Sequence, residues 1–328
     1  MGPPLRVINA TVWVGPPDFW ADQMLYMTDV VHAQPSAGAV TLDLSGYFIM
    51  PGLINAHDHL ELNHYPRSKF QKVYGNAHQW GEAMDARLDD SPYRELRAYP
   101  SADRLFSGGL KNLLSGATTV AQHNPPHKAL FRPDFPVRVL ERYGWAHSLH
   151  FDSPESIRAS YLSTPPDVPW FIHLAEGTDS VAASEYQQLK DLGCVGPNTV
   201  IVHGVGMTDA DIADAAQRVR GLVWCPSTNG YLLGETTPIR EWYLRNGVSV
   251  ALGSDSRLTA DGDILDEMHA AWSSTSAVDI HFMLEALTNR PAAILGLSDV
   301  GHLRPGARAA GIALTKNRGR WRRRDLAV

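Results

Sequence analysis

Residues able to bind a metal ion stand at the ends of four separate apolar, strand-like runs of this sequence. The runs are IMPGLINAHDHLEL, PWFIHLAEG, TVIVHGVGMTD and VSVALGSDSRLT, and the residues are His57, His59, His173, Glu176, His203 and Asp255. In a parallel (β/α) barrel the carboxyl ends of all strands open on one face, so groups far apart in the sequence can converge on one ion. The pattern predicts a hydrolytic metal site.

Each part of this pattern also has an ordinary structural explanation. Side chains two apart on a strand share a face, so His57 and His59 can supply half of a tetrahedral or trigonal-bipyramidal metal shell. An isolated HxH can equally be two polar residues at a strand exit. A lone histidine such as His173 or His203 is often a hydrogen-bonded core residue, and Asp255 could be a helix cap or a turn aspartate. The order and spacing of the whole set favour a shared site.

Several longer motifs resemble those of the amidohydrolase superfamily. Within it the similarity is to the branch of cytosine and guanine deaminases, triazine and chlorohydrolase-type enzymes, and imidazolonepropionase. It rests on PGLINAHDH, GATTV at 116–120, the H-x-x-E of His173 and Glu176, HGVGMTD, WCPSTNGYLLGETTPI and VALGSDS, and it spans about Gly46 to about Gly306.

The resemblance assigns roles to the predicted site residues. It implies that one metal is bound by His57, His59, His173 and Asp255. The residue matching His203 hydrogen-bonds the metal water or the substrate, and the one matching Glu176 shuttles protons. Two-metal members generally bridge their ions with a carboxylated lysine on the fourth strand, and this chain has no lysine between Lys128 and Lys190. We therefore expect one divalent metal per chain; Zn2+ is favoured, and Fe2+ or Mn2+ fit the same ligands.

The predicted ligand set suggests how catalysis would proceed. A metal of this kind lowers the pKa of bound water toward ~7. Asp255 would take the first proton, His203 would stabilise the developing negative charge, and Glu176 would donate a proton to a ring nitrogen or leaving group. Alternatively, Glu176 is an ordinary salt-bridge glutamate. These three residues are the expected catalytic groups.

The sequence defines the type of reaction more closely than it defines the substrate. We expect a metal-dependent hydrolase that acts on a C–N bond of a small planar substrate, with deamination of a nitrogen heterocycle favoured. Hydrolysis of an amide, cyclic amide or amidine in a specialised pathway is the alternative, and an inactive binding protein is a distant third. Residues that could line the substrate pocket are Glu61, His64, Trp80, His123, Asn229 and Arg257, although each could also be structural. Arg257 could pair with one substrate carboxylate.

The fold expected from these elements is α/β, a distorted (β/α)8 TIM-like barrel with a small β-sandwich annex. By resemblance, residues 1–51 and 300–328 build the annex from both chain ends, the latter with a basic tail, and residues 52–299 form the barrel. We place strand three at WAHSLHF and strand five at WFIHL. Because only about 20 residues separate these segments and a full crossover needs about 30, the fourth strand is expected to be vestigial or absent.

Composition limits the partners and the compartment. The chain has 328 residues, 44% of them hydrophobic, and a net charge of −6, which argues against nucleic acid or an anionic membrane as partner. The two cysteines are too few for a disulfide framework, and we expect Cys225 to be buried packing. No signal peptide or membrane-spanning stretch is evident. We expect a cytoplasmic enzyme with a small-molecule substrate; a homodimer remains open.

Overall fold

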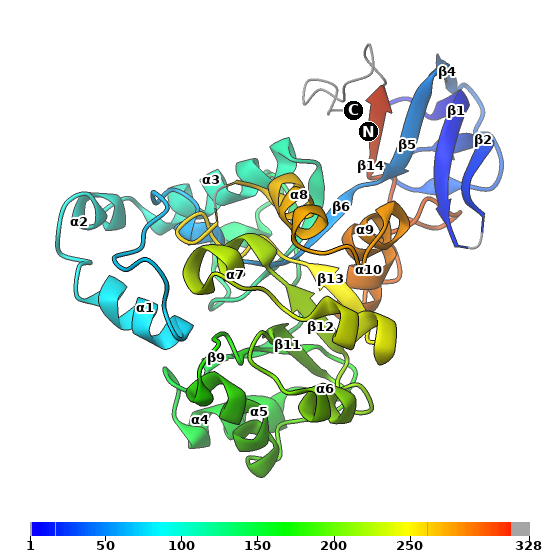
Figure 1. Ribbon diagram of the computed structural model, residues 1–328. Coiled ribbons are helices and arrows are strands. Elements are labelled where there is room, and N and C mark those ends of the chain that lie inside the picture. The colour runs from blue at the N-terminus through cyan, green and yellow to red at the C-terminus, as the bar shows by residue number, and fades with distance from the viewer. Residues whose placement is uncertain (1, 17, 261, 316–328) are drawn as a thin grey trace.

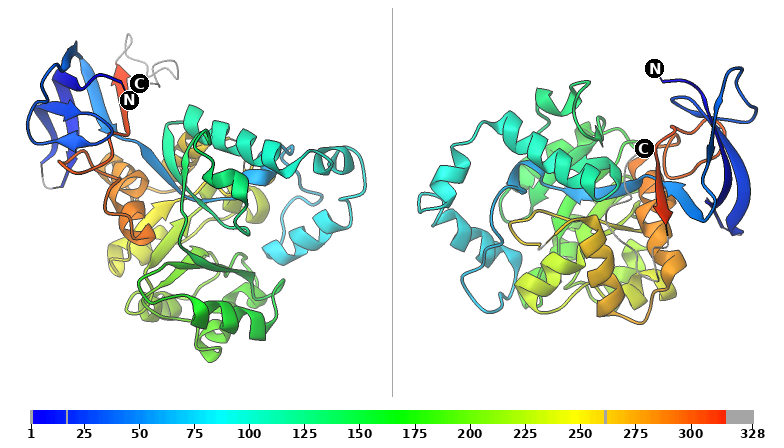
Figure 2. Two further views of the ribbon diagram at one scale, coloured as in Figure 1. Left: turned by 180° about the vertical axis from the view of Figure 1, so that it is seen from behind. Right: turned by 90° about the horizontal axis from the view of Figure 1, so that it is seen from above.

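The computed structural model describes residues 2–16, 18–260 and 262–315. A small β annex lies on one side of a barrel, and two short helices project on the opposite side (Figures 1 and 2). The basic run expected near the C-terminus falls outside the described residues. No helix in the described ranges combines the length and the apolar character needed to cross a bilayer.

Both ends of the chain contribute to the annex. Its six-stranded sheet has the order β14-β5-β1-β2-β3, with β4 paired parallel to β1. The strands are β1 (Leu5–Gly15), β2 (Phe19–Met27), β3 (Val31–His32), β4 (Val40–Asp43), β5 (Tyr47–Pro51) and β14 (Gly311–Thr315). The C-terminal β14 pairs antiparallel with β5, whose strand leads directly into the barrel. An annex made from both chain ends was expected.

Eight parallel strands form the barrel, as the fold prediction required. They are β6 (Leu53–Asp58), β7 (Ala117–Gln122), β8 (Arg138–Val139), β9 (Gly144–Ser148), β10 (Trp170–Leu174), β11 (Thr199–His203), β12 (Gly221–Trp224) and β13 (Val250–Leu252). Hydrogen-bonded ladders join them in the orders β6-β7-β8 and β13-β12-β11-β10-β9. An isolated parallel bridge pairs Asp58, at the end of β6, with Asp255, which lies beyond the end of β13 at Leu252. No ladder joins β8 to β9 within the described chain, so the barrel is distorted there.

The prediction about the fourth strand was wrong. The segment that we placed as strand three is β9, the fourth strand, and the stretch before WFIH carries a complete helix, α4 (Pro154–Ser163). The reduced unit is the third one, because β8 has two residues and follows the 3-10 turn η2 (Lys128–Phe131) instead of a helix. A strand of two residues has no alternation of apolar and polar side chains by which a sequence could reveal it.

The remaining helices surround the barrel. After β6 come η1 (Leu60–Leu62), α1 (Ala77–Asp85), α2 (Tyr93–Arg97) and α3 (Ser101–Leu114). The later ones are α5 (Ser180–Asp191), α6 (Asp209–Ala215), α7 (Pro226–Leu233), the π-helical η3 (Arg240–Arg245), α8 (Ile264–Ser274), α9 (Ile280–Leu287) and α10 (Asn289–Leu295). Helix α6 begins at a capping box formed by Thr208 and Asp211.

The barrel is packed inside and outside, because its strands are covered on both faces. One apolar cluster fills the interior and includes Ile54, Phe171, Val202, Val223 and Ala251. A larger cluster lies between the strands and the helices, and includes Trp170, Leu189 and Trp242. This packing fixes the positions of the strand ends. The residues that follow those ends therefore have defined relative positions.

Candidate metal centre

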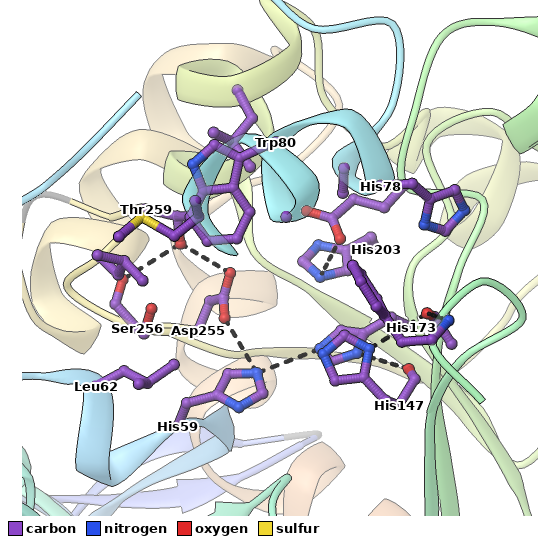
Figure 3. A pocket seen from close by; sticks show the side chains of 18 of the residues that line it. His59, Leu62, His78, Trp80, His147, His173, His203, Asp255, Ser256 and Thr259 are labelled. Carbon is purple, nitrogen blue, oxygen red and sulfur yellow. Dashed lines mark hydrogen bonds and ion pairs between the residues drawn. The ribbon is translucent and has the colours of Figure 1, made fainter. Parts of the chain in front are cut away.

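The four predicted metal ligands lie together at the carboxyl ends of β6, β10 and β13. Figure 3 shows three of them, His59, His173 and Asp255. His173 Nε2 is 3.2 Å from His57 Nε2 and 3.3 Å from His59 Nε2. Asp255 Oδ1 is 3.6 Å from His57 Nε2 and 3.5 Å from His59 Nε2. Ligand bonds of ~2.0–2.1 Å around a tetrahedral zinc ion would separate the ligand atoms by roughly 3.3–3.4 Å. The donor atoms therefore fit a small divalent cation.

Hydrogen bonds behind the ligands leave Nε2 of His57 and His173 free to bind a metal. A carbonyl oxygen can only accept, so His123 Nε2 donates to Ala146 O at 3.0 Å and His123 Nδ1 is left as an acceptor. His57 Nδ1, 3.1 Å away, must then be the donor to it. His173 Nδ1 likewise donates to His147 O at 2.8 Å. Both Nε2 atoms therefore carry lone pairs that face the other ligands.

Burial keeps these imidazoles neutral. It lowers the pKa of His57 to about 3 and lowers the pKa values of His173 and His123 well below their ordinary range. The neutral imidazoles of His57 and His173, whose Nε2 lone pairs face one another at 3.2 Å, repel unless a cation lies between them. Tautomer, charge and spacing together agree with a histidine-rich metal site.

His123 should therefore act through His57 on metal affinity. We expect His123→Ala to lower the affinity for zinc by about 10–100-fold, the effect typical of losing an outer hydrogen-bond partner of a ligating histidine. A competition titration with a chelator measures this affinity. His269→Ala is the matched control, because His269 is exposed on α8. Unchanged affinity in the His123 variant would exclude this orienting role.

Strained backbone presents the reactive groups. Ala175, His203 and Asp255 have φ of 53°, 74° and 52°, a region that non-glycine residues rarely adopt and that costs about 1–3 kcal/mol each. Neighbouring contacts hold two of them, since Asp255 N–H donates to His57 O at 3.0 Å and Ala175 N–H donates to Glu185 at 2.5 Å. Such strain is typical of functional sites.

A second group of donors, made of Glu176, His203 and Asp255, adjoins the ligand cluster. His203 Nδ1 donates to Asn229 Oδ1 at 2.9 Å, so its Nε2 is an acceptor, and this atom lies 3.3 Å from Glu176 Oε2. Burial, followed by the charges of Asp255 and Glu185, raises the pKa of Glu176 well above its ordinary value. The geometry and the pKa both favour a proton held on Glu176.

A cavity of about 500 Å³ opens over these residues (Figure 3). Its polar floor includes His59, His173, Glu176, His203 and Asp255. The apolar part of its wall comprises Leu62, Ala77, Trp80, Gly81, Met84, Leu88, Phe151, Leu232 and Leu258. Helix α1 thus covers the site, with Trp80 on its inner face. The Trp80 indole is held in place because it donates to Ser68 O at 2.9 Å.

The other proposed substrate contacts are not on this wall. Glu61 accepts hydrogen bonds from Gln122 and Asn124, and His64 donates to Leu96 O at 3.0 Å. His123 is buried and hydrogen-bonded to His57 Nδ1, and Asn229 Oδ1 accepts a hydrogen bond from His203. The Arg257 side chain is exposed, and its backbone N–H donates to Asn63 Oδ1 at 3.0 Å. Of the six, only Trp80 lines the cavity. Cys225 is buried and free, as expected of packing.

The lining residues that the sequence analysis did not predict include three titratable groups close to the ligands or to α1: His78, His147 and Glu185. His147 stands on β9, the strand on which the resemblance places a carboxylated lysine in two-metal relatives. His78 on α1 contacts Glu185 on α5 at 2.5 Å. The H-x-x-E pattern points to Glu176, but no local pattern links His78 with Glu185, which are 107 residues apart.

Helix α1 is joined to the loop that carries Glu176. Ala77 N–H donates to Glu176 O at 2.8 Å, and Thr178 N–H donates to Gly75 O at 2.8 Å. Asn76 forms an antiparallel bridge with Gly177. Any Cβ at position 177 would lie 2.6 Å from the Asn76 Cβ, so glycine is required for this close approach. These contacts connect α1, which covers the cavity, to the loop that carries Glu176.

Barrel, ligand cluster and buried acid together define a metal-dependent hydrolase. Residues 139–320, more than half of the chain, match the model of the amidohydrolase family, and the chain belongs to this family. It is accordingly a hydrolase that acts on carbon–nitrogen bonds other than peptide bonds. The branch-level resemblance inferred from the motifs is confirmed.

Individual relatives agree with this assignment. A 5-methylthioadenosine/S-adenosylhomocysteine deaminase of Haloarcula marismortui is 32% identical over 319 residues, covering 82% of this chain and 73% of the relative. The Halobacterium salinarum protein of the same name is 26% identical over 324 residues, covering 83% and 74%.

Solved structures agree with the fold. A triazine hydrolase from Arthrobacter aurescens superimposes with a TM-score of 0.76 at 19% identity, covering 95% of this chain and 87% of that one. An adenosine deaminase from Xanthomonas campestris with bound zinc gives 0.72 at 18% identity, covering 94% and 85%.

Proposed function

We propose that the chain deaminates a nitrogen heterocycle at a single zinc ion bound by His57, His59, His173 and Asp255. The ion is supported by four separations of 3.2–3.6 Å between the donor atoms of these residues, three of which are histidines. The metal, when bound, makes a water molecule nucleophilic at neutral pH. The same ligand chemistry would accept Fe2+ or Mn2+.

Residues beside the proposed metal position have separate roles in the reaction. Asp255 Oδ1 faces the histidine ligands, while its Oδ2 accepts a hydrogen bond from the Thr259 hydroxyl at 3.0 Å. This fixes the carboxylate in a position to take a proton from attacking water. His203 adjoins the same space and can stabilise negative charge that develops on the substrate. Its orientation depends on Asn229, whose amide donates to Thr237 Oγ1 at 3.1 Å.

The observation that carries the proposal is the position of Glu176 beside the ligand cluster: its side chain is 12% exposed, its Oε2 lies 3.3 Å from His203 Nε2, and its raised pKa favours the protonated form. A ring carbon accepts the oxygen of water more readily when the adjacent ring nitrogen is protonated, and a carboxylic acid of raised pKa can donate that proton. The C–N bond to the exocyclic amine then breaks, and the amine leaves as ammonia after receiving a proton. The relatives named as deaminases and as a triazine hydrolase support a heterocyclic substrate.

An ammonia-release assay tests this function. Aminopurine nucleosides, aminopyrimidines, aminopterins and aminotriazines are supplied to the zinc-loaded enzyme, beside cyclic amides and amidines. We expect ammonia from at least one heterocycle, at a rate abolished by chelation. Ring opening of cyclic amides with no ammonia from any heterocycle would replace deamination with amide hydrolysis.

A further inference from the structure

A closed ring of contacts holds the backbone on both sides of Glu176. The Glu176 carbonyl oxygen accepts a hydrogen bond from Ala77 N–H at 2.8 Å, and the preceding amide, Ala175 N–H, donates to Glu185 Oε2 at 2.5 Å. His78, which follows Ala77 on α1, closes the ring, because its Nε2 lies 2.5 Å from Glu185 Oε1. The ring thus joins α1 and α5 to the loop that follows β10.

Glu185 has a defined position within this ring. The residue is 3% exposed, and each of its carboxylate oxygens has a partner, Oε2 in Ala175 and Oε1 in His78. A carboxylate only accepts hydrogen bonds, so His78 Nε2 is the donor. The His78 ring is stacked on His150, with centroids 4.5 Å apart and planes at 21°. This stacking restricts rotation of the imidazole that holds Glu185.

The amide that Glu185 accepts belongs to a strained residue. Ala175 stands directly before Glu176 and has φ of 53°, in the left-handed region that alanine rarely adopts. Within the described chain, Glu185 is the hydrogen-bond acceptor recorded for the Ala175 N–H. Without that acceptor the buried N–H would be unpaired, and the strain would favour a return to an ordinary conformation. Such a relaxation would turn the next peptide and move Glu176 Oε2 from its place 3.3 Å from His203 Nε2.

We propose that Glu185 is a positioning residue for Glu176: its carboxylate holds the strained peptide of Ala175, and this places the acid beside His203. His78 supports Glu185 from α1. The role rests on the deaminase function proposed above, in which Glu176 is the proton donor. A displacement of about 1 Å in a reacting group can cost about 10²-fold in rate, so a contact made outside the reacting atoms can control turnover.

A double-mutant cycle tests this route on the heterocycle found to release ammonia. Glu185→Met replaces the carboxylate with an unbranched apolar side chain, and we expect it to lower kcat by about tenfold or more. Zinc content should be unchanged, because Glu185 is not a proposed ligand. In the Glu176→Gln background the same substitution should lower kcat by no more than about twofold, since no acid remains to be positioned.

The cycle also separates this inference from the function on which it rests. Equal losses from Glu185→Met in both backgrounds would show a general structural role and would overturn the positioning role while deamination stands. A near-normal rate in Glu176→Gln alone would instead remove the proton donor, and this inference with it.

Glu185→Gln distinguishes the contact from the charge. The charge of Glu185 is one of the causes that raise the pKa of Glu176, so its loss is an alternative explanation for a slow variant. The glutamine oxygen can still accept from Ala175 N–H, and its amide can donate to His78 Nε2 once that ring carries its proton on Nδ1. We expect kcat to recover most of the loss caused by methionine. An equal loss in the two variants would assign the effect to charge and reject the positioning role.

His78→Phe tests the ring from α1 and needs no change at Glu185. Phenylalanine can keep the stacking on His150 but cannot donate to Glu185, so kcat should fall several-fold, and this loss should disappear in the Glu176→Gln background. His150→Phe is the matched control, because the contact of His150 with Glu82 at 3.0 Å lies outside both the ring and the cavity lining. The control should keep the normal kcat. Equal values of kcat in the two phenylalanine variants would reject the part assigned to His78.

Discussion

Replacing His173 with alanine is expected to remove the metal and to lower turnover by at least about 10³-fold, because metal activation of water supplies several kcal/mol of barrier reduction. His173 Nε2 contacts both His57 and His59, so its loss opens the shell on the side of β10. Elemental analysis after dialysis, together with the ammonia-release rate, measures both effects. The exposed His269→Ala variant should retain metal and rate.

The same elemental analysis tests the number of ions. We expect the unmodified enzyme to hold close to one equivalent of transition metal per chain. Glu176 and His203 adjoin the ligand cluster, so two tightly bound ions would show that this second donor group also binds metal. A His173→Ala variant that keeps its full metal content would contradict the proposed ligand set.

Replacing Glu176 with glutamine is expected to reduce kcat by about 10²-fold or more, the scale of a lost general acid–base group. Glutamine preserves the shape of the side chain but has no exchangeable carboxyl proton to donate. Metal content should stay at the unmodified level, since Glu176 is not among the four proposed ligands. Steady-state kinetics and elemental analysis on one preparation separate these outcomes.

Glu235→Gln provides the matched control for this substitution. Glu235 is exposed and lies outside the cavity lining, so its variant should keep the normal rate. A near-normal rate in Glu176→Gln would remove Glu176 from the mechanism. Loss of metal in that variant would instead show that Glu176 is a metal ligand, and the proposed set of four ligands would have to change.

The positions of the proposed ligand residues could be predicted because each follows a continuous apolar run. In a barrel of parallel strands, covered on both faces, such runs end on one face, and this places His57, His173 and Asp255 without further information. Strand β8 could not be found in this way, since two residues carry no periodic signal.

The cavity wall was far less predictable. Helix α1 lies within the long connection from β6 to β7, and its position depends on tertiary contacts such as the one between His78 and Glu185. Strand-end position alone also misplaced His123: it follows β7 directly, as a pocket residue should, yet it packs behind His57. Proximity to a ligand in sequence does not determine which way a loop side chain faces.

The backbone contacts between residues 75–77 and 176–178 restrict the movement of α1 relative to the loop that carries Glu176. Because Ala77 N–H and Thr178 N–H connect the two segments, α1 cannot be displaced without pulling on the peptide of Glu176. A displacement of α1 would therefore also shift the backbone of Glu176 and change the 3.3 Å distance between Glu176 Oε2 and His203 Nε2. The position of the cavity wall and the position of the proton donor are thus coupled through the backbone.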